Sequence, residues 1–393
     1  MSRSGRSGTD GGLDAASVAA EIADAPFVRV VARASGDAVA AAGLLGRVLA
    51  TRGTPFQVSV GRTIADRTRR VEEASSGDVS VVVGESRASD ALHLDPDDEP
   101  ASVAAWRLAG ELGATADSVL ALVGVAASGV TPGAGSSARL VESAEAGGRL
   151  DRRPGVAGPT DDVVDALAHS TLVHASFSGD SEGAESAVAT LGFDEVDGLS
   201  DSARRRVASF VAVATTGAGE APSRASDAVE RALLPYALTD STPFETVAGY
   251  ADVLAALASS QPGTGVALAL GHDVVDGALS AWREHAQATH EAVASCERAR
   301  HDGLVVVSNV DAPLSTTARL VRDYRSPEPV VAAVSDDAVA VAADVDATDA
   351  NVGDVLGRVT TQLGGEYDGT PDAGYATFEC DTEQFVTTLR EEV

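Results

Sequence analysis

The sequence predicts an α/β protein, with a parallel-sheet domain followed by a smaller C-terminal α/β domain. Two observations lead to this prediction. Between residues 13 and 127, short β-branched runs alternate with helical patterns, which is typical of a parallel sheet covered by helices. The alternation stops near residue 161 and returns at Gly303. A chain of 393 residues is long enough to build two such cores.

The first domain should begin with a short amphipathic helix over residues 13–23, after a Gly- and Ser-rich stretch. Continuous β-branched runs suit buried parallel strands, and the segments between them are rich in Ala and Leu or start at a capping residue. We therefore expect strands at 27–32, 56–60 and 79–83, and helices at 38–50, 100–112 and 119–127.

The rest of the chain divides into three parts. Residues 129–158 are rich in Gly, Ser, Pro and Arg, which indicates a long excursion at the rim of the sheet, and residues 161–299 are mostly helical in pattern. The C-terminal part should hold strands at 304–307, 330–334, 339–343 and 375–378, and helices at 314–324, 352–363 and up to 391. The expected organisation is a disordered tail (1–12), a first domain (13–280), a connecting helix (281–302) and a C-terminal domain (303–393).

The charge balance indicates habitat rather than activity. The chain carries 59 acidic and 29 basic residues, every basic one an Arg, for a net charge of −30. The acidic residues are spread over the whole chain, as in proteins that stay soluble in molar salt. The two cysteines are far apart, and no apolar run is long enough for a membrane helix. We therefore expect a cytoplasmic protein without disulfide, zinc site or membrane partner.

The histidines offer little sign of a metal site. His169 and His174 are five residues apart, as are His285 and His290, and neither spacing places two imidazoles on one helix face as metal ligands. We expect these side chains to be solvated or to cap helices.

Four stretches, at residues 30–43, 100–126, 249–271 and 351–374, occur in a characteristic order. The first is a strand that ends at Arg33-Ala-Ser-Gly-Asp37 and leads into a helix of small residues, and the last is rich in glycine. Together they resemble the DHH/DHHA1 phosphoesterase family, in particular its archaeal, RecJ-like branch as found in haloarchaea. The resemblance implies a parallel-sheet DHH domain and a smaller DHHA1 domain.

The resemblance also implies a metal-dependent reaction. In that family, carboxylates and imidazoles hold paired Mn²⁺ or Mg²⁺ ions, which serve the hydrolysis of phosphodiesters. The first motif places Arg33, Ser35 and Asp37 at the ligand positions, so Asp37 alone keeps a carboxylate there. A guanidinium at Arg33 repels a divalent cation. Glu85, which follows the third expected strand, is a candidate metal ligand at a shifted position. Convergence of Glu85, Asp95 or Asp165 on Asp37 would favour an active metal site.

The resemblance also implies a nucleic-acid contact in the C-terminal domain, where glycines let backbone amides approach a phosphate. The histidine of the family signature is replaced by Thr370. A tight turn between helix and strand explains the same glycines equally well, so both interpretations stay open. The residues in question are Gly364, Gly365, Gly369, Thr370 and Gly374.

Family members that have lost catalysis serve as structural subunits of DNA replication assemblies. The resemblance therefore implies a catalytically degenerate scaffold or regulatory subunit that binds single-stranded nucleic acid and replication or repair proteins, and that needs no cofactor. The alternative is an active exonuclease or phosphodiesterase that acts on single-stranded DNA and uses Mn²⁺ or Mg²⁺. A third, weaker alternative is a regulatory protein that binds nucleotides through the glycine turn.

Overall fold

The computed structural model describes residues 15–94, 99–192, 199–217, 219, 221–233, 235–239 and 242–393. The expected tail at 1–12 and the candidate ligand Asp95 lie outside these ranges. Among the helices in the described part of the chain, none combines the length and apolar character needed to cross a bilayer.

The first sheet has four parallel strands in the order β2-β1-β3-β4. Valine dominates its inner strands because both faces of a parallel sheet are covered. A fourth strand around His93, which sequence patterning did not indicate, closes one edge. The strands are β1 (Val28–Arg33), β2 (Phe56–Gly61), β3 (Val79–Val83) and β4 (Ala91–Leu94).

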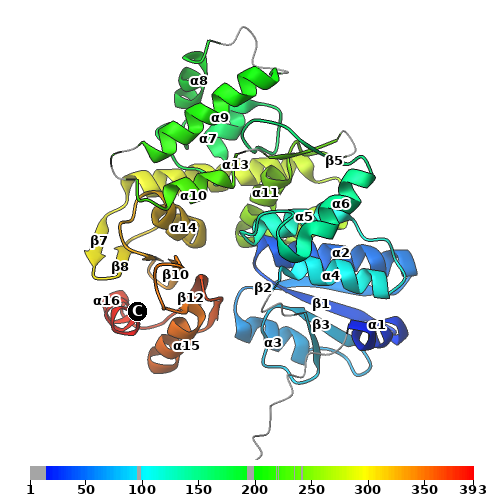
Figure 1. Ribbon diagram of the computed structural model, residues 1–393. Helices are drawn as coiled ribbons and strands as arrows, with labels where there is room; N and C mark the ends of the chain where they lie inside the picture. Colours follow the sequence, from blue (N-terminus) through cyan, green and yellow to red (C-terminus); the bar gives the residue numbers. More distant parts are fainter. Residues whose placement is uncertain are drawn as a thin grey trace, which may run out of the picture.

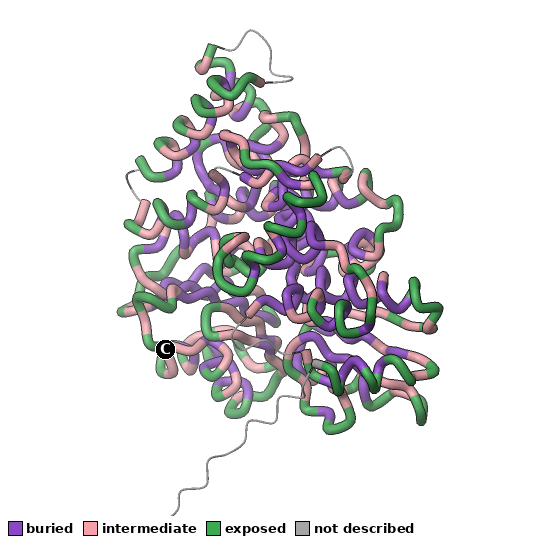
Figure 2. The backbone as a smooth tube through the Cα atoms, turned by 45° about the vertical axis from the view of Figure 1, so that its right-hand side comes forward, coloured by how far each residue is buried: buried purple, intermediate pink, exposed green. Residues whose placement is uncertain are grey.

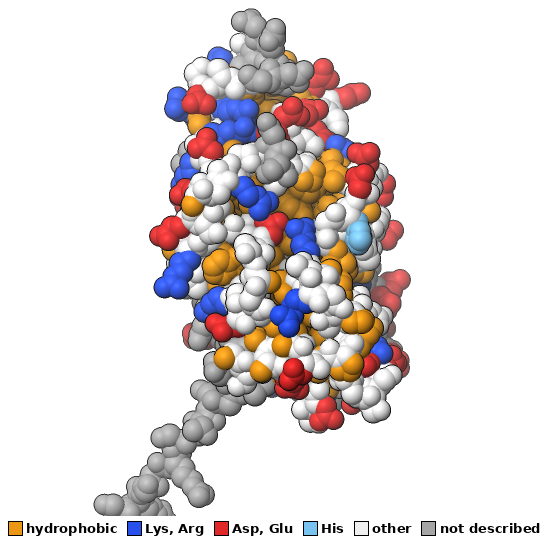
Figure 3. All heavy atoms as spheres, turned by 90° about the vertical axis from the view of Figure 1, so that its right-hand side faces the viewer, with side chains coloured by type: hydrophobic (Ala, Val, Ile, Leu, Met, Phe, Trp, Pro, Cys, Tyr) orange, Lys and Arg blue, Asp and Glu red, His pale blue; other side chains and the backbone are white. Residues whose placement is uncertain are grey.

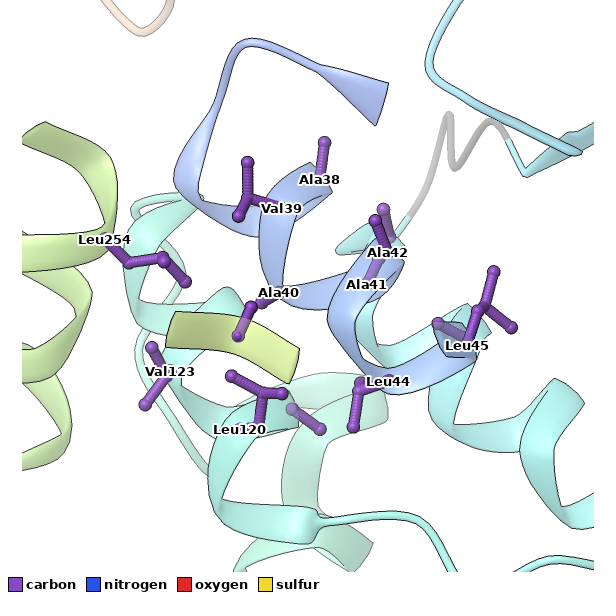
Figure 4. Close-up of a cluster of buried hydrophobic side chains, with 14 of the residues drawn as sticks. Ala38, Val39, Ala40, Ala41, Ala42, Leu44, Leu45, Leu120, Val123 and Leu254 are labelled. Carbon is purple, nitrogen blue, oxygen red and sulfur yellow. The ribbon is translucent and has the colours of Figure 1, made fainter. Parts of the chain in front are cut away.

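Helix α2 (Gly36–Arg52) forms the centre of the first domain and is buried along most of its length. It packs between the sheet and four other helices, and a Cβ added at Gly43 would lie 2.5 Å from the Cβ of Ala269. Its small residues therefore allow the close helix packing seen in Figure 4, where Leu120 and Val123 approach it. The surrounding helices are α4 (Ala101–Glu111), α5 (Ser118–Ala127), α11 (Val247–Ser260) and α12 (Pro262–Leu270); α1 (Ala15–Asp24) and α3 (Ile64–Glu72) complete the domain.

A helical lobe stands above the two sheets (Figure 1) and contains little strand, as the sequence indicates. The stretch at 129–158 is more ordered than its composition suggests, because it contains a 3₁₀ turn, a helix and a short strand that pairs with a later segment. The elements of this region are α6 (Ala138–Ala146), β5 (Leu150–Arg152), α7 (Val163–His169), α8 (Ser181–Ala189), α9 (Asp201–Thr216), α10 (Ala225–Glu230), β6 (Tyr236–Leu238) and α13 (Val275–Ser295).

The C-terminal sheet is separate from the first and has six strands in the order β11-β12-β10-β9-β8-β7. It is antiparallel except for the parallel pair β8–β9. Figure 2 shows a buried interior in each lobe, with exposed backbone outside. The elements are β7 (Arg298–His301), β8 (Leu304–Val307), α14 (Leu314–Tyr324), β9 (Val330–Val334), β10 (Ala338–Ala343), α15 (Val352–Leu363), β11 (Tyr367–Gly369), β12 (Ala373–Thr377) and α16 (Thr382–Glu392).

The predicted helix at 281–302 is wrong at its C-terminal end. Helix α13 stops at Ser295, and residues 298–301 form strand β7. Arg and Glu are interleaved along the predicted helix, but Arg298-Ala-Arg-His301 forms an exposed edge strand. The turn at Asp302-Gly303, with Gly303 at a φ of 76°, closes a hairpin instead.

Three histidines are buried, contrary to the sequence-based expectation of solvated or capping side chains. Arg325 donates to Nε2 of His174 (3.1 Å), the Nδ1 atoms of His174 and His290 are 3.0 Å apart, and Nε2 of His290 lies 3.1 Å from the carbonyl of Ser170. This chain of hydrogen bonds has a donor and an acceptor at every contact when both imidazoles are neutral and His174 donates to His290. Burial, together with nearby positive charge, lowers the pKa of His174 to about 3, and burial lowers that of His290 to about 4.

The buried histidines predict a loss of stability in acid. Because their pKa values are lower in the folded protein, the unfolded chain binds more protons below about pH 6.5, so stability falls as pH drops toward 4. In His174→Gln, the decrease in the free energy of unfolding toward pH 4 should be smaller by about 2 kcal/mol than in the wild type. Urea unfolding in molar KCl across this pH range, beside the exposed control His272→Gln, measures it. The same dependence of the free energy of unfolding on pH in all three proteins would contradict the prediction.

Candidate functional site at the carboxyl ends of the first sheet

The carboxyl ends of β1, β2 and β3 lie side by side and face the C-terminal domain. Arg33 at the end of β1 is in register with Gly61 at the end of β2, and Ala32 with Val83 at the end of β3. Ligands of open parallel sheets bind at this edge. Gly84, directly after β3, has a φ of 112°, and a Cβ there would lie 3.1 Å from the Cβ of Arg33.

Arg67 occupies the middle of this edge with a side chain that is 0% exposed. It projects from α3, and its guanidinium spans the strand ends. Nε donates to the carbonyl of Glu85 (2.7 Å), one terminal nitrogen to the carbonyl of Gly61 (3.1 Å), and the other to Oδ1 of Asp368 (2.5 Å). All three nitrogens of this cation are therefore bonded, which a buried guanidinium requires.

Asp368 reaches the site from the C-terminal domain, where it lies on β11. Its second oxygen, Oδ2, forms an ion pair with Nε of Arg33 at 2.6 Å, so one carboxylate joins two guanidinium groups. Asp368 is 8% exposed at its side chain and Arg33 is 22% exposed. This three-residue group (Arg33, Arg67 and Asp368), called the arginine clamp below, carries a net positive charge and connects the two domains.

A second set of contacts supports the clamp along α3. Glu366, just before β11, accepts from the hydroxyl of Thr63 (2.6 Å) and from Arg69 (2.6 Å). These hydrogen bonds, with the charge of Arg69, lower the pKa of the Glu366 carboxyl. Arg62 lies over the ring of Tyr375, 5.3 Å from its centroid. Several charged and aromatic contacts therefore connect the two domains at this point.

Asp37 and Ser35 serve helix ends. Ser35 is the N-cap of α2 and accepts from the N–H of Ala38 at 3.3 Å. Asp37 is buried and accepts from the N–H groups of Ala101 (2.7 Å) and Ser102 (3.0 Å) at the start of α4. Burial raises its pKa, against these hydrogen bonds and the charge of Arg33, which lower it.

The other candidate ligands do not gather around Asp37. Glu85 is exposed, and its backbone carbonyl rather than its carboxylate contacts the clamp. Asp165 lies on α7 in the helical lobe, where Arg283 donates to both of its oxygens (2.8 and 2.9 Å) and His169 approaches at 3.0 Å. Although burial acts to raise it, these partners hold the pKa of Asp165 below its usual range.

The glycine-rich segment has tight packing contacts. A Cβ at Gly369 would lie 2.4 Å from the Cα of Gly353, one at Gly374 would lie 2.6 Å from Leu356, and one at Gly365 would lie 2.0 Å from the carbonyl of Thr377. These glycines let α15 and the chain after it approach β11 and β12. The first two N–H groups of α15 donate to the carbonyls of Pro371 and Thr370, and Thr370 donates through its hydroxyl to Asp372. Nucleic-acid binding by this segment stays a prediction.

Gly365→Ala is expected to lower the free energy of unfolding by about 2 kcal/mol or more, because the added methyl group meets a backbone carbonyl at a positive φ. Gly364→Ala is the comparison: it also has a positive φ (81°), but no atom lies within 4 Å of the added Cβ, so it should cost only the backbone strain, about 1–3 kcal/mol, and less than Gly365→Ala. Thermal unfolding compares them. An equal decrease in the free energy of unfolding for both variants would show that close packing is not the reason for glycine at position 365.

The sequence interpretation missed Arg67 and Asp368. A signal for Arg67 exists: Ile64, Arg67 and Val71 occupy the buried stripe of α3 at helical spacing, and an Arg at such a position must reach a partner inside. Asp368 stands in the glycine-rich stretch, but nothing local indicates that its partner is about three hundred residues away in sequence.

The donor set at this edge does not fit a divalent metal. Two guanidinium groups occupy the strand ends, and their charge opposes that of Mn²⁺ or Mg²⁺. Across the described ranges, no group of three or more His, Cys, Asp or Glu side chains is arranged to hold a metal ion.

Comparison of the whole chain with other proteins decides its family. A protein of Haloarcula marismortui, described as "Uncharacterized protein rrnAC1427", is 43% identical over 394 residues, which cover 100% of both chains. The chain belongs to the rrnAC1427 family. A family model described as "Uncharacterized protein rrnAC1427, C-terminal domain" also matches residues 296–391, which include the six-stranded sheet.

Solved structures identify the fold of this rrnAC1427 family member. CDC45 from Entamoeba histolytica superposes with a TM-score of 0.60 at 10% identity, covering 95% of this chain and 96% of that one. RecJ in complex with Mg²⁺ from Thermus thermophilus gives a TM-score of 0.50 at 15% identity, covering 96% of this chain and 50% of that one. The chain has the RecJ-like fold of a parallel-sheet DHH domain with a smaller α/β domain of the DHHA1 type.

Proposed function

We propose that this protein is a catalytically degenerate, haloarchaeal member of the RecJ-like DHH/DHHA1 proteins. In this proposal it acts as a scaffold or regulatory subunit in DNA replication or repair, where it binds nucleic acid and protein partners. One observation carries the proposal: the edge of the sheet where this fold would bind metals holds the arginine clamp.

The clamp has two consequences that favour a scaffold. Its charge excludes divalent cations from the strand ends. Its bonds also tie β11 to α3 and β1, so that the two domains present one fixed surface instead of an open cleft. Acidic side chains are spread over the face seen in Figure 3 rather than gathered in one patch, so partner binding would have to use local sites.

The alternative function, a Mn²⁺-dependent exonuclease on single-stranded DNA, needs more ligands than Asp37. Glu85 is exposed and Asp165 is paired in another lobe, while Asp95 lies outside the described residues. Asp37 itself is committed to the N-terminus of α4.

Calorimetric titration with Mn²⁺ in molar KCl, beside an exonuclease assay on end-labelled single strands, tests the proposal. We expect no stoichiometric heat and no shortening of the strands, while fluorescence anisotropy detects binding of the same oligonucleotide. Stoichiometric Mn²⁺ binding that Asp37→Ala abolishes, together with cleavage, would refute the degenerate scaffold and support the enzyme. Absence of both cleavage and oligonucleotide binding would refute the nucleic-acid part.

A further inference from the structure

A small cavity lies in the helical lobe, between α7, α9 and the chain that follows β5. Its volume is about 30 Å³, enough for one or two particles of the size of a water molecule. Pockets for nucleotides and other organic ligands are larger, from about 300 Å³ upward. The apolar part of its wall includes Val156, Val163, Leu167, Leu199 and Val207. Two arginines, Arg153 and Arg204, line the same cavity.

Arg153 brings a buried hydrogen-bond donor to this cavity. Its Nε is buried and has no acceptor among the described residues. A terminal nitrogen of the same guanidinium donates to Glu245, which holds the other edge of the group in place. A buried N–H on a cation costs free energy when it lacks an acceptor, because it has lost its hydrogen bond to water. Nε of Arg153 therefore requires an acceptor small enough to enter the cavity.

Arg204 adds a second guanidinium that the protein does not neutralise. Its Nε donates to the carbonyl of Leu199 at 3.0 Å, but no carboxylate in the described part of the chain forms an ion pair with it. The segment after Arg153 runs along its stem, since a Cβ added at Gly155 would lie 3.6 Å from the Cβ of Arg204. Burial lowers the pKa of Arg204, and the charge of Arg153 lowers it further. The two cations therefore repel each other across the lining.

Two carboxylates line the cavity as well and act against an anion. Glu245 is bound to a terminal nitrogen of Arg153, and Asp161 is exposed, so that water and salt screen its charge. Each of them affects the pKa of Arg204 less than Arg153 does. Nε of Arg153 and the terminal nitrogens of Arg204 are left without a negative partner.

The size of the cavity and the chemistry of these donors favour a chloride ion. A single-atom anion fits the space, whereas phosphate, carboxylates and nucleotides are larger. It accepts hydrogen bonds from several N–H groups at once, and its charge relieves the repulsion between the two guanidinium groups. A water molecule also fits, but it leaves that repulsion in place. In the molar salt that the dispersed acidic charge predicts, a chloride site of modest affinity would be filled.

We propose that this cavity binds a chloride ion between Nε of Arg153 and the guanidinium of Arg204. The ion joins α9 to the chain that follows β5, and so stabilises the helical lobe (Figure 1) through a specific contact in addition to the general effect of salt. No residue of the arginine clamp lines this cavity. The inference goes beyond the proposed scaffold function and does not depend on it.

Thermal unfolding of the full-length protein tests the proposal. Chloride replaces glutamate at a constant, molar potassium concentration, so ionic strength stays the same. An ion that binds only the folded protein raises the unfolding midpoint as its concentration increases. In Arg204→Gln, about tenfold more chloride should be needed for the same rise, because a charged hydrogen-bond donor is lost.

Arg205→Gln is the matched control. It removes the same charge from the next position of α9, where the side chain is exposed and does not line the cavity. General effects of exchanging glutamate for chloride act on all three proteins alike. Each midpoint is compared with that of the same protein in glutamate alone, so a loss of stability caused by the substitution itself does not enter the comparison. Arg205→Gln should respond to chloride as the wild type does.

Crystals soaked in KBr locate the ion, because bromide replaces chloride and scatters X-rays anomalously. We expect an anomalous peak within hydrogen-bond distance of Nε of Arg153 in the wild type, and no peak there in Arg204→Gln.

Three results would overturn the proposal. The first is a response to chloride that is the same in Arg204→Gln as in the wild type. The second is a weaker response in Arg205→Gln that matches that of Arg204→Gln, which would assign the effect to general charge on α9. The third is a wild-type crystal without an anomalous peak in the cavity, which would assign the space to water.

Discussion

Asp368→Asn is expected to lower the free energy of unfolding by about 3–5 kcal/mol, because it removes the only carboxylate of the arginine clamp. Arg67 is fully buried, so its charge cannot be solvated by water when its partner becomes neutral. Arg33, which is partly exposed, should contribute less to the loss. Urea unfolding in molar KCl measures the change.

The same loop supplies a matched control. Asp372 is exposed and bonds to the hydroxyl of Thr370, so Asp372→Asn should change stability by less than about 0.5 kcal/mol. Loss of domain contact should also appear in solution scattering as a larger radius of gyration for Asp368→Asn. If both variants unfold at the same urea concentration as the wild type, the clamp does not hold the domains together.

Asp37→Ala is expected to lower the free energy of unfolding by about 3 kcal/mol, because it leaves two buried N–H groups at the start of α4 without an acceptor. The substitution should not change Mn²⁺ binding, since the carboxylate is used by the helix. Thermal unfolding and the calorimetric titration measure the two effects separately.

An ordinary helix cap gives the comparison for Asp37. Asp180 caps α8 from a more exposed position and accepts one N–H, from Glu182, so Asp180→Ala should cost about 1 kcal/mol. Equal losses for the two variants would mean that burial of the Asp37 contacts adds nothing. Loss of Mn²⁺ binding in Asp37→Ala would show instead that this carboxylate is a metal ligand.

A buried ion pair keeps more of its strength in molar salt than an exposed one. Screening shortens the Debye length to about 3 Å at 1 M salt, which weakens exposed ion pairs far more than buried ones. The contact between Arg67 and Asp368 is enclosed by both domains and is shielded from this effect. Exposed pairs such as Arg358 with Glu392 lie at the surface, where salt competes with them.

The sequence indicated where in the fold the candidate site lies, but not which side chains contact one another there. The motif around Arg33 lies at the end of a β-branched run, so its position at the carboxyl end of a strand can be read from the local sequence. The role of Asp37 cannot be read from the local sequence, because an acidic residue in the first turn of a helix ordinarily interacts with that same helix. Its acceptor contacts come from Ala101 and Ser102, which only the packing of α4 on α2 brings near.

Hydrophobic periodicity and composition were enough to predict the alternation of valine-rich strands with helices, the two separate sheets, and the dispersed acidic charge. Folding in three dimensions decided that Arg33 and Arg67 share Asp368, that His174 and His290 are buried as a neutral pair, and that β7 is an edge strand. These outcomes have a common cause. Whether a charged side chain is solvated, paired or excluded depends on its burial and on partners distant in the sequence, and local pattern carries no information about either.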